Sequence, residues 1–159
     1  MKQFKIAFNL SWVVCLILFV SGFQNLKAQD SDSAMVLAQN QAFYNAFKSA
    51  DIKKMDKVWT HNEFVSAIHP ISKDVILGWK GVRDSFEGVF KNYTGIDIKP
   101  VNQIVHVEGN VAWVLQNEDF TAMQGDKKIK LESGATNIFI KNFGKWLMVH
   151  HQATVAMKM

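Results

Sequence analysis

Histidines supply the most promising chemistry in this chain of 159 residues. His69 directly precedes Pro70, and a proline favours an extended backbone for the residue before it. A neutral imidazole accepts protons near pH 7, so His69 is a candidate catalytic base. The alternative is that His69 only ends a strand and fixes the next loop through a hydrogen bond.

A second pair of histidines, His150 and His151, lies near the C-terminus. Neighbouring residues of a strand point to opposite faces, so this pair is poorly arranged to bind one metal ion. No His-x-x-x-His pair, nucleophile-elbow motif or glycine-rich phosphate loop is present, and we expect neither a metal nor a cofactor. Strand alternation predicts that His151 faces a cavity together with Leu147, Val149 and Ala153.

Aromatic residues recur at spacings that suit either a ligand cavity or an ordinary core. The candidates are Phe43, Phe47, Trp59, Trp79, Phe86 and Trp113. Asn117 and Asp119 share strand parity with Trp113, so an inward Trp113 would place both in the cavity. Polar groups there need hydrogen-bond partners from protein, water or ligand, and Asp119 could orient one of the histidines.

The N-terminus has the three parts of a secretory signal. Residues 1–28 begin with basic residues, continue through an apolar run from Ile6 to Phe23, and end at Ala28, a plausible cleavage site. We therefore expect a periplasmic or secreted domain of residues 29–159, with no membrane association after cleavage. The alternative is an uncleaved membrane anchor, because the apolar run approaches the length of a membrane-spanning helix.

Cleavage would change the charge and the cysteine content of the protein. Residues 1–28 contain three lysines and no acid, so the formal charge of +4 becomes +4 − 3 = +1. A nearly neutral domain without a basic run gives no reason to expect nucleic acid as a partner. The single cysteine, Cys15, also leaves, and the mature domain must depend on its core rather than on a disulfide.

The remaining pattern predicts an α+β fold. Apolar residues at helical spacing indicate a first helix capped by Ser31 or Ser33, a second capped by Asp51, and a third over residues 79–91. β-branched and aromatic runs separated by short turns predict strands at 64–70, 101–107, 111–120, 128–141 and 145–155, with a bulge or bend at Gly134. We expect three helices packed on a curved, mostly antiparallel sheet, with a cavity at the open end.

This order of elements resembles the nuclear transport factor 2-like superfamily, whose fold is a cone, and in particular its SnoaL-like branch. The resemblance is carried by Trp59, His69-Pro70, Gly78-Trp79 and the closing strand from Gly144 to His151. That strand is also similar to the last strand of the calcium/calmodulin-dependent kinase association domain. The superfamily includes enzymes and non-catalytic assembly domains, so the resemblance implies a fold rather than one activity.

Comparison with the ketosteroid isomerases assigns roles position by position. Their catalytic aspartate precedes a proline, and His69 takes the similar place here. Their two oxyanion donors fall, by spacing, on Phe43 and Thr136. Phe43 cannot donate a hydrogen bond and Thr136 is a weaker donor than a carboxylic acid, which argues against steroid isomerisation.

We therefore expect the cavity to bind a small, largely apolar molecule. Any chemistry would be cofactor-independent proton transfer or elimination, with His69 as the base and His151 or Asn117 positioning the substrate. The alternative is a non-catalytic binding or assembly module. In either case we expect a homodimer formed through the sheet face.

Overall fold

The computed structural model describes the backbone of residues 10–155 and the side chains of residues 29–155. The chain divides into two compact units, Met1–Asp32 and Ser33–Met159. The signal-sequence prediction falls on residues 1–9, which lie outside the described part, and on residues 10–28, whose side chains are not described. It stays a prediction. In the described part, no helix combines the length and the apolar character needed to cross a membrane.

The first helix, α1, runs over Leu10–Lys48. Ser31 and Ser33 lie inside it, so the prediction that one of them caps the helix is wrong. A serine lowers helix stability by well under ~1 kcal/mol relative to alanine, and helix-forming neighbours such as Ala34 and Met35 let the helix continue. The buried side chains of its second half, which include Val36, Phe43 and Phe47, follow the expected helical period.

A short second helix, α2 (Ile52–Met55), begins at the predicted cap. The Asp51 carboxylate accepts hydrogen bonds from the backbone N–H groups of Lys53 and Lys54, at 3.0 and 3.2 Å. The helix is shorter than the apolar pattern suggests, because Trp59 leaves it and forms a parallel bridge with Met148. The third helix, α3, covers Gly78–Asn92 and buries Val82 and Phe86.

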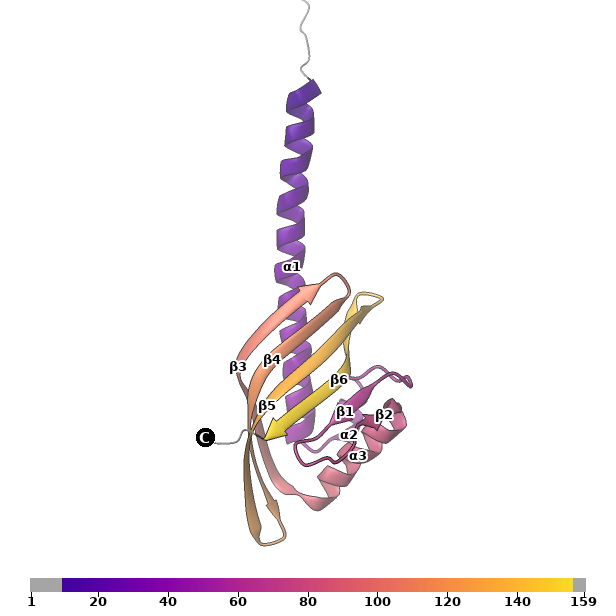
Figure 1. Cartoon of the computed structure of the whole chain (residues 1–159), viewed down its shortest axis with the longest axis vertical. Helices are drawn as coiled ribbons and strands as arrows, with labels where there is room; N and C mark the ends of the chain where they lie inside the picture. The colour runs from indigo at the N-terminus through magenta and orange to yellow at the C-terminus, as the bar shows by residue number, and fades with distance from the viewer. Residues whose placement is uncertain (1–9, 156–159) are drawn as a thin grey trace, which may run out of the picture. The chain divides into compact units, whose positions relative to one another are not determined.

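Six strands form one curved sheet that does not close into a barrel (Figure 1). In chain order they are β1 (Ser66–Ile68), β2 (Ile76–Leu77), β3 (Thr94–Glu108), β4 (Val111–Gln124), β5 (Lys127–Asn142) and β6 (Lys145–Val155). Their spatial order is β2-β1-β6-β5-β4-β3, and every neighbouring pair is antiparallel except β1 with β6. The α+β architecture predicted from the sequence is confirmed.

The strands differ from the predicted ones at their ends and in one irregularity. β3 starts seven residues earlier than expected, and β2 has no apolar run long enough to predict it. The register of β5 against β4 passes Gly134 without a shift, so the predicted bulge there is wrong. Register shifts lie elsewhere: two between β3 and β4, and one between β5 and β6, where Ile138 pairs with His150 and Phe139 pairs with Met148. Val149 is the extra residue.

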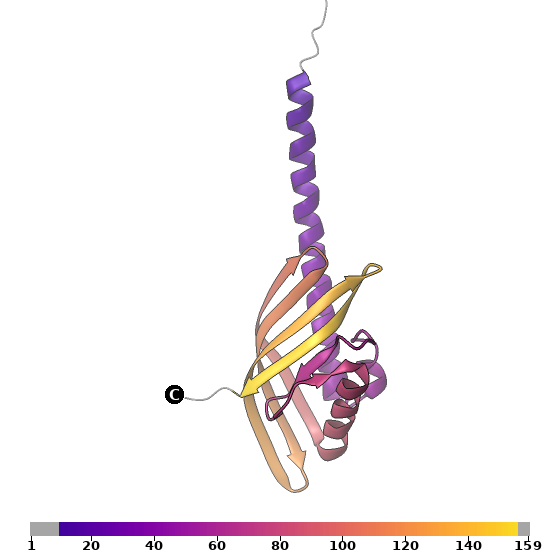
Figure 2. The ribbon, with the colours of Figure 1, turned by 45° about the vertical axis from the view of Figure 1, so that its right-hand side comes forward.

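The core lies between the concave face of the sheet and the helices. Figure 2 shows the short strands β1 and β2 continuing the sheet beyond β6, next to α3. Aromatic rings from α1 and α3 pack edge-on, with 5.8 Å between the centres of Phe43 and Phe86 and 5.6 Å between those of Phe47 and Phe86. This packing fills part of the space between the layers, and a cavity lies beside it, with Phe47 on its wall.

Candidate functional site

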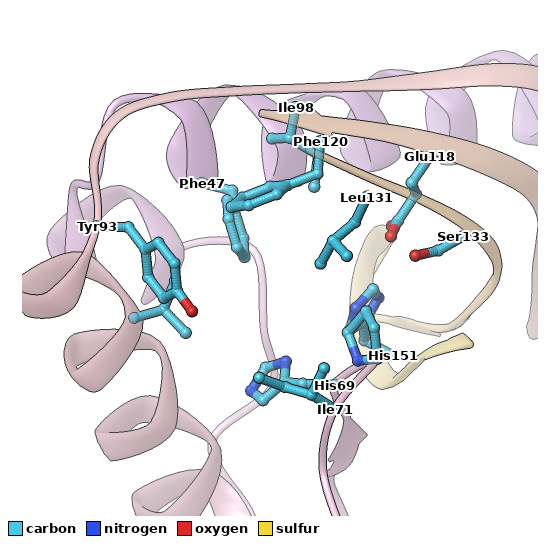
Figure 3. A pocket seen from close by; sticks show the side chains of 12 residues that line it. Phe47, His69, Ile71, Tyr93, Ile98, Glu118, Phe120, Leu131, Ser133 and His151 are labelled. Carbon is cyan, nitrogen blue, oxygen red and sulfur yellow. The ribbon is translucent and has the colours of Figure 1, made fainter. Parts of the chain in front are cut away.

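A mostly apolar cavity of about 80 Å³ lies between the layers. Twelve residues line it: Phe47, His69, Pro70, Ile71, Val89, Tyr93, Ile98, Glu118, Phe120, Leu131, Ser133 and His151. Figure 3 shows aromatic rings such as Tyr93 and Phe120 on one side, and Glu118, Ser133 and His151 on the other. A water-sized group needs roughly 10–15 Å³ by this measure, so the space suits about five to eight such groups.

His69 is placed at this cavity by the end of β1. Its backbone N–H donates to the Ser72 hydroxyl at 3.1 Å, which fixes the turn that follows Pro70. Its Nε2 lies 2.9 Å from the Ser85 hydroxyl of α3, and the Phe86 ring packs edge-on against it at 5.1 Å. Burial lowers the pKa of His69 to about 4, so the ring is neutral at pH 7.

His151 comes from β6 and is almost fully buried. Its Nδ1 lies 2.7 Å from the Asn137 side-chain oxygen, and its ring centre is 6.3 Å from that of His69. Burial, and then the neighbouring His69 and His150, lower the pKa of His151 to about 3. Two neutral imidazoles therefore share one cavity wall.

Glu118 is the acidic group of the cavity and is only 4% exposed. Its Oε1 accepts a hydrogen bond of 2.5 Å from the Tyr44 hydroxyl. Burial raises the pKa of Glu118 to about 7, because the ionised carboxylate loses solvation that one hydrogen bond does not replace. Burial, and then the Glu118 charge, raise the pKa of Tyr44. Near neutral pH Glu118 therefore exchanges between its acid and carboxylate forms.

A buried polar network stands behind these groups. The Tyr44 hydroxyl accepts from the side-chain amides of Gln116 and Asn137. The Asn137 amide also donates to Asn40 at 2.7 Å, and the Asn40 amide donates to Gln116 at 2.8 Å. The network links Glu118 to His151 through Tyr44 and Asn137, and it fixes the orientation of each amide.

Several predicted ligand-contacting residues lie on the opposite face of the sheet. Asn117 and Asp119 are exposed, and Trp113 and Thr136 share their outward parity. The placement of all four at the cavity is therefore wrong. The inward residues of β4 are Ala112, Val114, Gln116 and Glu118. Phe120 and Ala122 continue this inner face, and Phe120 lines the cavity. The reason for the wrong placement is that the middle of β4 carries a polar pair inside, where the network satisfies it, and Trp113 and Leu115 outside.

The predicted aromatic residues are divided between cavity and core. Phe47 lines the cavity. Phe43 and Phe86 are fully buried core residues behind it, and each contacts one of the two histidine rings. Trp59 is a core residue, and Trp79 stacks on His61 at 4.6 Å rather than lining the cavity. Phe43, Phe86, Trp59 and Trp79 are therefore all absent from the lining of this cavity, where the sequence predicted them.

The bulge in β6 explains why only some residues of that strand face the side that strand alternation predicts. His151 and Ala153 face inward as strand alternation predicts, but Leu147 and Val149 do not. Before the bulge, Trp146 and Met148 are the buried residues. An extra residue at Val149 reverses the parity, because alternation restarts one position later.

The sequence reasoning missed Glu118, Tyr44, Asn40 and Asn137. A signal existed for the two residues of α1, because Asn40 and Tyr44 lie at i+4 and i+8 from the buried Val36. The helical period alone places both on the buried face. Over residues 29–155, no group of three or more histidine, cysteine or acidic side chains is arranged to hold a metal ion.

Comparison with known proteins places this fold in a family. The SnoaL-like domain family matches residues 36–158. The chain belongs to the SnoaL-like family. It is also similar to a protein of the NTF2-like family from Streptomyces avermitilis, provisionally described as a dehydratase, at 25% identity and a TM-score of 0.74, over 81% of this chain and 99% of that one. The resemblance to the nuclear transport factor 2-like superfamily is confirmed.

Two further relatives show the range of the family. This SnoaL-like chain is similar to a Thiobacillus denitrificans protein provisionally described as a calcium/calmodulin-dependent protein kinase type II association domain, at 25% identity and a TM-score of 0.59, over 76% and 94% of the two chains. It is 24% identical to the F-box protein SKIP8 of Arabidopsis thaliana over 120 residues, 76% of this chain. It spans about half the length of that relative, 49%.

Proposed function

We propose that this SnoaL-like protein binds a small, largely apolar molecule in its cavity and catalyses proton transfer or elimination on it without a cofactor. The observation that carries the proposal is the convergence of His69, His151 and Glu118 on one mostly apolar cavity. When the surroundings of two titratable groups give them different pKa values, one can act as an acid and the other as a base at the same pH.

The roles follow from the protonation states. His69 is neutral at pH 7 and is the candidate base, while Glu118 holds its proton for part of the time and is the candidate acid. In an elimination, His69 would take a proton from carbon, the C–O bond to a neighbouring hydroxyl would break, and Glu118 would protonate the departing oxygen. The products are an alkene and water, and proton exchange with solvent restores both side chains.

The proposal is tested with a small β-hydroxyketone and a small ketone, such as 4-hydroxybutan-2-one and cyclohexanone. Water loss from the first and deuterium exchange next to the carbonyl of the second are both followed by NMR. We expect Glu118→Gln and His69→Ala to lower either rate by ~10²-fold or more. His106→Ala is the matched control, because that histidine stacks on the outward Trp113 at 5.3 Å.

Wild-type protein with rates no higher than those of the His69→Ala variant would refute the catalytic part of this proposal. Ligand-dependent thermal stabilisation, measured in parallel across small ketones, alcohols and lactones, then decides whether the cavity still binds. Stabilisation without turnover would favour the alternative, a non-catalytic binding module.

We also propose that two copies associate through the outer face of the sheet. Ile104 and Leu115 pair across β3 and β4 on this face, with 56% and 40% of their surfaces exposed. Val111, four residues before Leu115 on the same strand, is exposed as well. Exposed apolar residues that cluster in this way are typical of protein interfaces. Light scattering coupled to gel filtration measures the assembly directly.

Export of the domain is the remaining part of the proposal. It is supported by the basic, apolar and small-residue segments of residues 1–28. Expression of the full chain in a bacterial host, followed by intact-mass measurement of the periplasmic fraction, tests it. A mature protein that begins at Gln29 is expected, and a full-length protein in the membrane fraction would favour the anchor.

A further inference from the structure

The hydrogen bonds around His69 determine which of its nitrogen atoms carries the proton. The Ser85 hydroxyl donates to the backbone carbonyl of Val82 at 2.6 Å, which uses its only proton. Its oxygen must therefore accept from His69, so Nε2 is the protonated nitrogen. In the neutral ring Nδ1 then holds a lone pair. In Figure 3 one ring nitrogen points toward α3 and the other toward the cavity.

A second chain of hydrogen bonds determines the tautomer of His151. The Asn137 amide nitrogen donates to Asn40 and to Tyr44, so the oxygen of Asn137 faces His151. Nδ1 of His151 is then the donor, and Nε2 is left with a lone pair. Within the described residues Nε2 has no hydrogen-bond partner, and the only buried polar side-chain atom without a partner there is Trp59 Nε1. Nε2 of His151 therefore reaches open space, and the cavity is the space that this residue lines.

The hydrogen bonds around His69 and those around His151 together leave the cavity richer in hydrogen-bond acceptors than in donors. Two imidazoles present acceptors to it, and the Glu118 carboxylate is a third acceptor once it is ionised. The hydroxyls of Tyr93 and Ser133 also line the cavity, and each can donate or accept a hydrogen bond, so acceptors outnumber donors without excluding them. The twelve lining residues include no lysine or arginine. An anion would therefore meet acceptors and a carboxylate, and a cation would lose its hydration among mostly apolar side chains.

We propose that the ligand of this cavity is a small alcohol or phenol, whose hydroxyl group donates a hydrogen bond to the unprotonated nitrogen of His69 or His151. This assignment rests on the proposed binding role of the cavity and goes beyond it by naming the chemical class. A ketone, ether or carboxylate of the same size has no proton to offer these nitrogens.

The first test needs no ligand. Two-dimensional ¹⁵N–¹H NMR of the imidazole rings reports which nitrogen carries the proton. At pH 8 we expect Nε2–H for His69 and Nδ1–H for His151. In Ser85→Ala the acceptor for Nε2–H is lost, and the His69 signals should shift toward a mixture of tautomers while those of His151 stay unchanged. The opposite tautomers in the wild-type protein would overturn the assignment.

The second test is a binding panel of matched size at pH 8, followed by calorimetry or NMR titration. The probes are cyclohexanol, cyclohexanone and cyclohexanecarboxylate. We expect cyclohexanol to bind about 5- to 10-fold more tightly than cyclohexanone, the effect of one net hydrogen bond, and the carboxylate to bind most weakly. In Ser85→Ala this preference should shrink, because His69 can then donate to a ketone. His106→Phe is the control that should keep the wild-type preference.

The outcomes separate this assignment from the proposed function. Cyclohexanone that binds as tightly as cyclohexanol overturns the hydroxyl preference and leaves a small-molecule cavity in place. Failure of all three probes to bind overturns both the assignment and the binding role. If Ser85→Ala keeps both the preference for cyclohexanol and the tautomer of His69, then Ser85 does not set that tautomer. This result would overturn the assignment of the hydroxyl preference to His69.

Discussion

In the middle of β4, between Trp113 and Glu118, the two faces reverse the usual distribution of polar and apolar side chains. The inner face buries Gln116 and Glu118, whereas the outer face exposes Leu115 next to Trp113. A sheet packed on helices normally buries its large apolar residues and exposes its polar ones. The buried Gln116 and Glu118 are stabilised by a hydrogen-bonded network. The exposed Leu115 and the outward Trp113 are typical of a surface that binds another protein. The polar residues lie at the proposed ligand site, and the apolar ones lie at the proposed dimer interface.

The comparison predicts that asparagines on the two faces differ most in their contribution to stability. Asn137→Ala removes the partner of His151 and Asn40 from a buried site, and we expect a loss of about 3–4 kcal/mol in the free energy of unfolding. Asn117→Ala, on the exposed face of the neighbouring strand, should change it by less than about 0.5 kcal/mol. Urea denaturation measures both. Equal losses would mean that the network contributes little.

A second difference concerns pH. The folded-state pKa of Glu118 is raised from 4.5 to about 7, so the folded protein holds a proton that the unfolded chain releases between these values. Ionisation of Glu118 therefore destabilises the fold as pH rises from 4.5 to 7, by up to about 3 kcal/mol, and adds nothing further above pH 7. Glu118→Gln should gain stability relative to the wild-type protein across this window. Denaturation at pH 4.5, 6 and 7.5 measures the gain, and a constant difference would contradict it.

The histidines act in the opposite direction in the same window. The lowered pKa values mean that the unfolded chain binds protons that the folded protein does not, between about pH 4 and 6.5 for His69 and between about pH 3 and 6.5 for His151. Their contribution to stability therefore rises with pH and is complete above pH 6.5. For this reason the pH effect of Glu118 must be read from the difference between wild type and variant rather than from the wild-type curve alone.

The outer face should control assembly instead of stability. Leu115→Lys places a charge in the exposed apolar cluster, and we expect it to weaken self-association by about 10-fold or more with little effect on the monomer. Sedimentation at several protein concentrations gives the dissociation constant. A wild-type protein that is monomeric at high concentration would remove the proposed role of this face.

The smallest effect is expected at Thr136. This residue lies on the outer side and pairs with Leu115 and Gln152, so it has no path to the cavity. Thr136→Ala should change ligand affinity by less than about 2-fold and stability by less than about 0.5 kcal/mol. The same titration that is used for the cavity variants provides the measurement. A large loss of affinity would show that Thr136 contacts the ligand after all.

Much of the architecture could be predicted from local chemistry. The Asp51 cap, the third helix and the long hairpin strands depend on short-range patterns, and all are present. The choice of inner face on β4 could not be read in the same way, because Leu115 and Trp113 look like core residues and Glu118 looks like a surface residue. Only the three-dimensional pairing of Glu118 with Tyr44 makes its burial tolerable.

The candidate site was predicted in part for a related reason. His69 and His151 line the cavity, which their sequence contexts suggested. The partners that set their tautomers come from residues 16 and 14 positions away, on other elements. A single extra residue at Val149 also changes which side chains of β6 face inward. Such long-range pairings and bulges leave no periodic signature for sequence reasoning to detect.

The parallel pairing of β1 with β6 fixes the positions of His69 and His151 relative to each other. Ala67 lies directly beside His151 in the ladder, and His69 follows Ala67 by two residues. The spacing between the rings is therefore inherited from the backbone of the sheet rather than adjusted by flexible side chains. Ile71, in the loop beyond Pro70, also lines the cavity, so a substitution there reshapes the cavity without touching the ladder that sets the separation of the two rings.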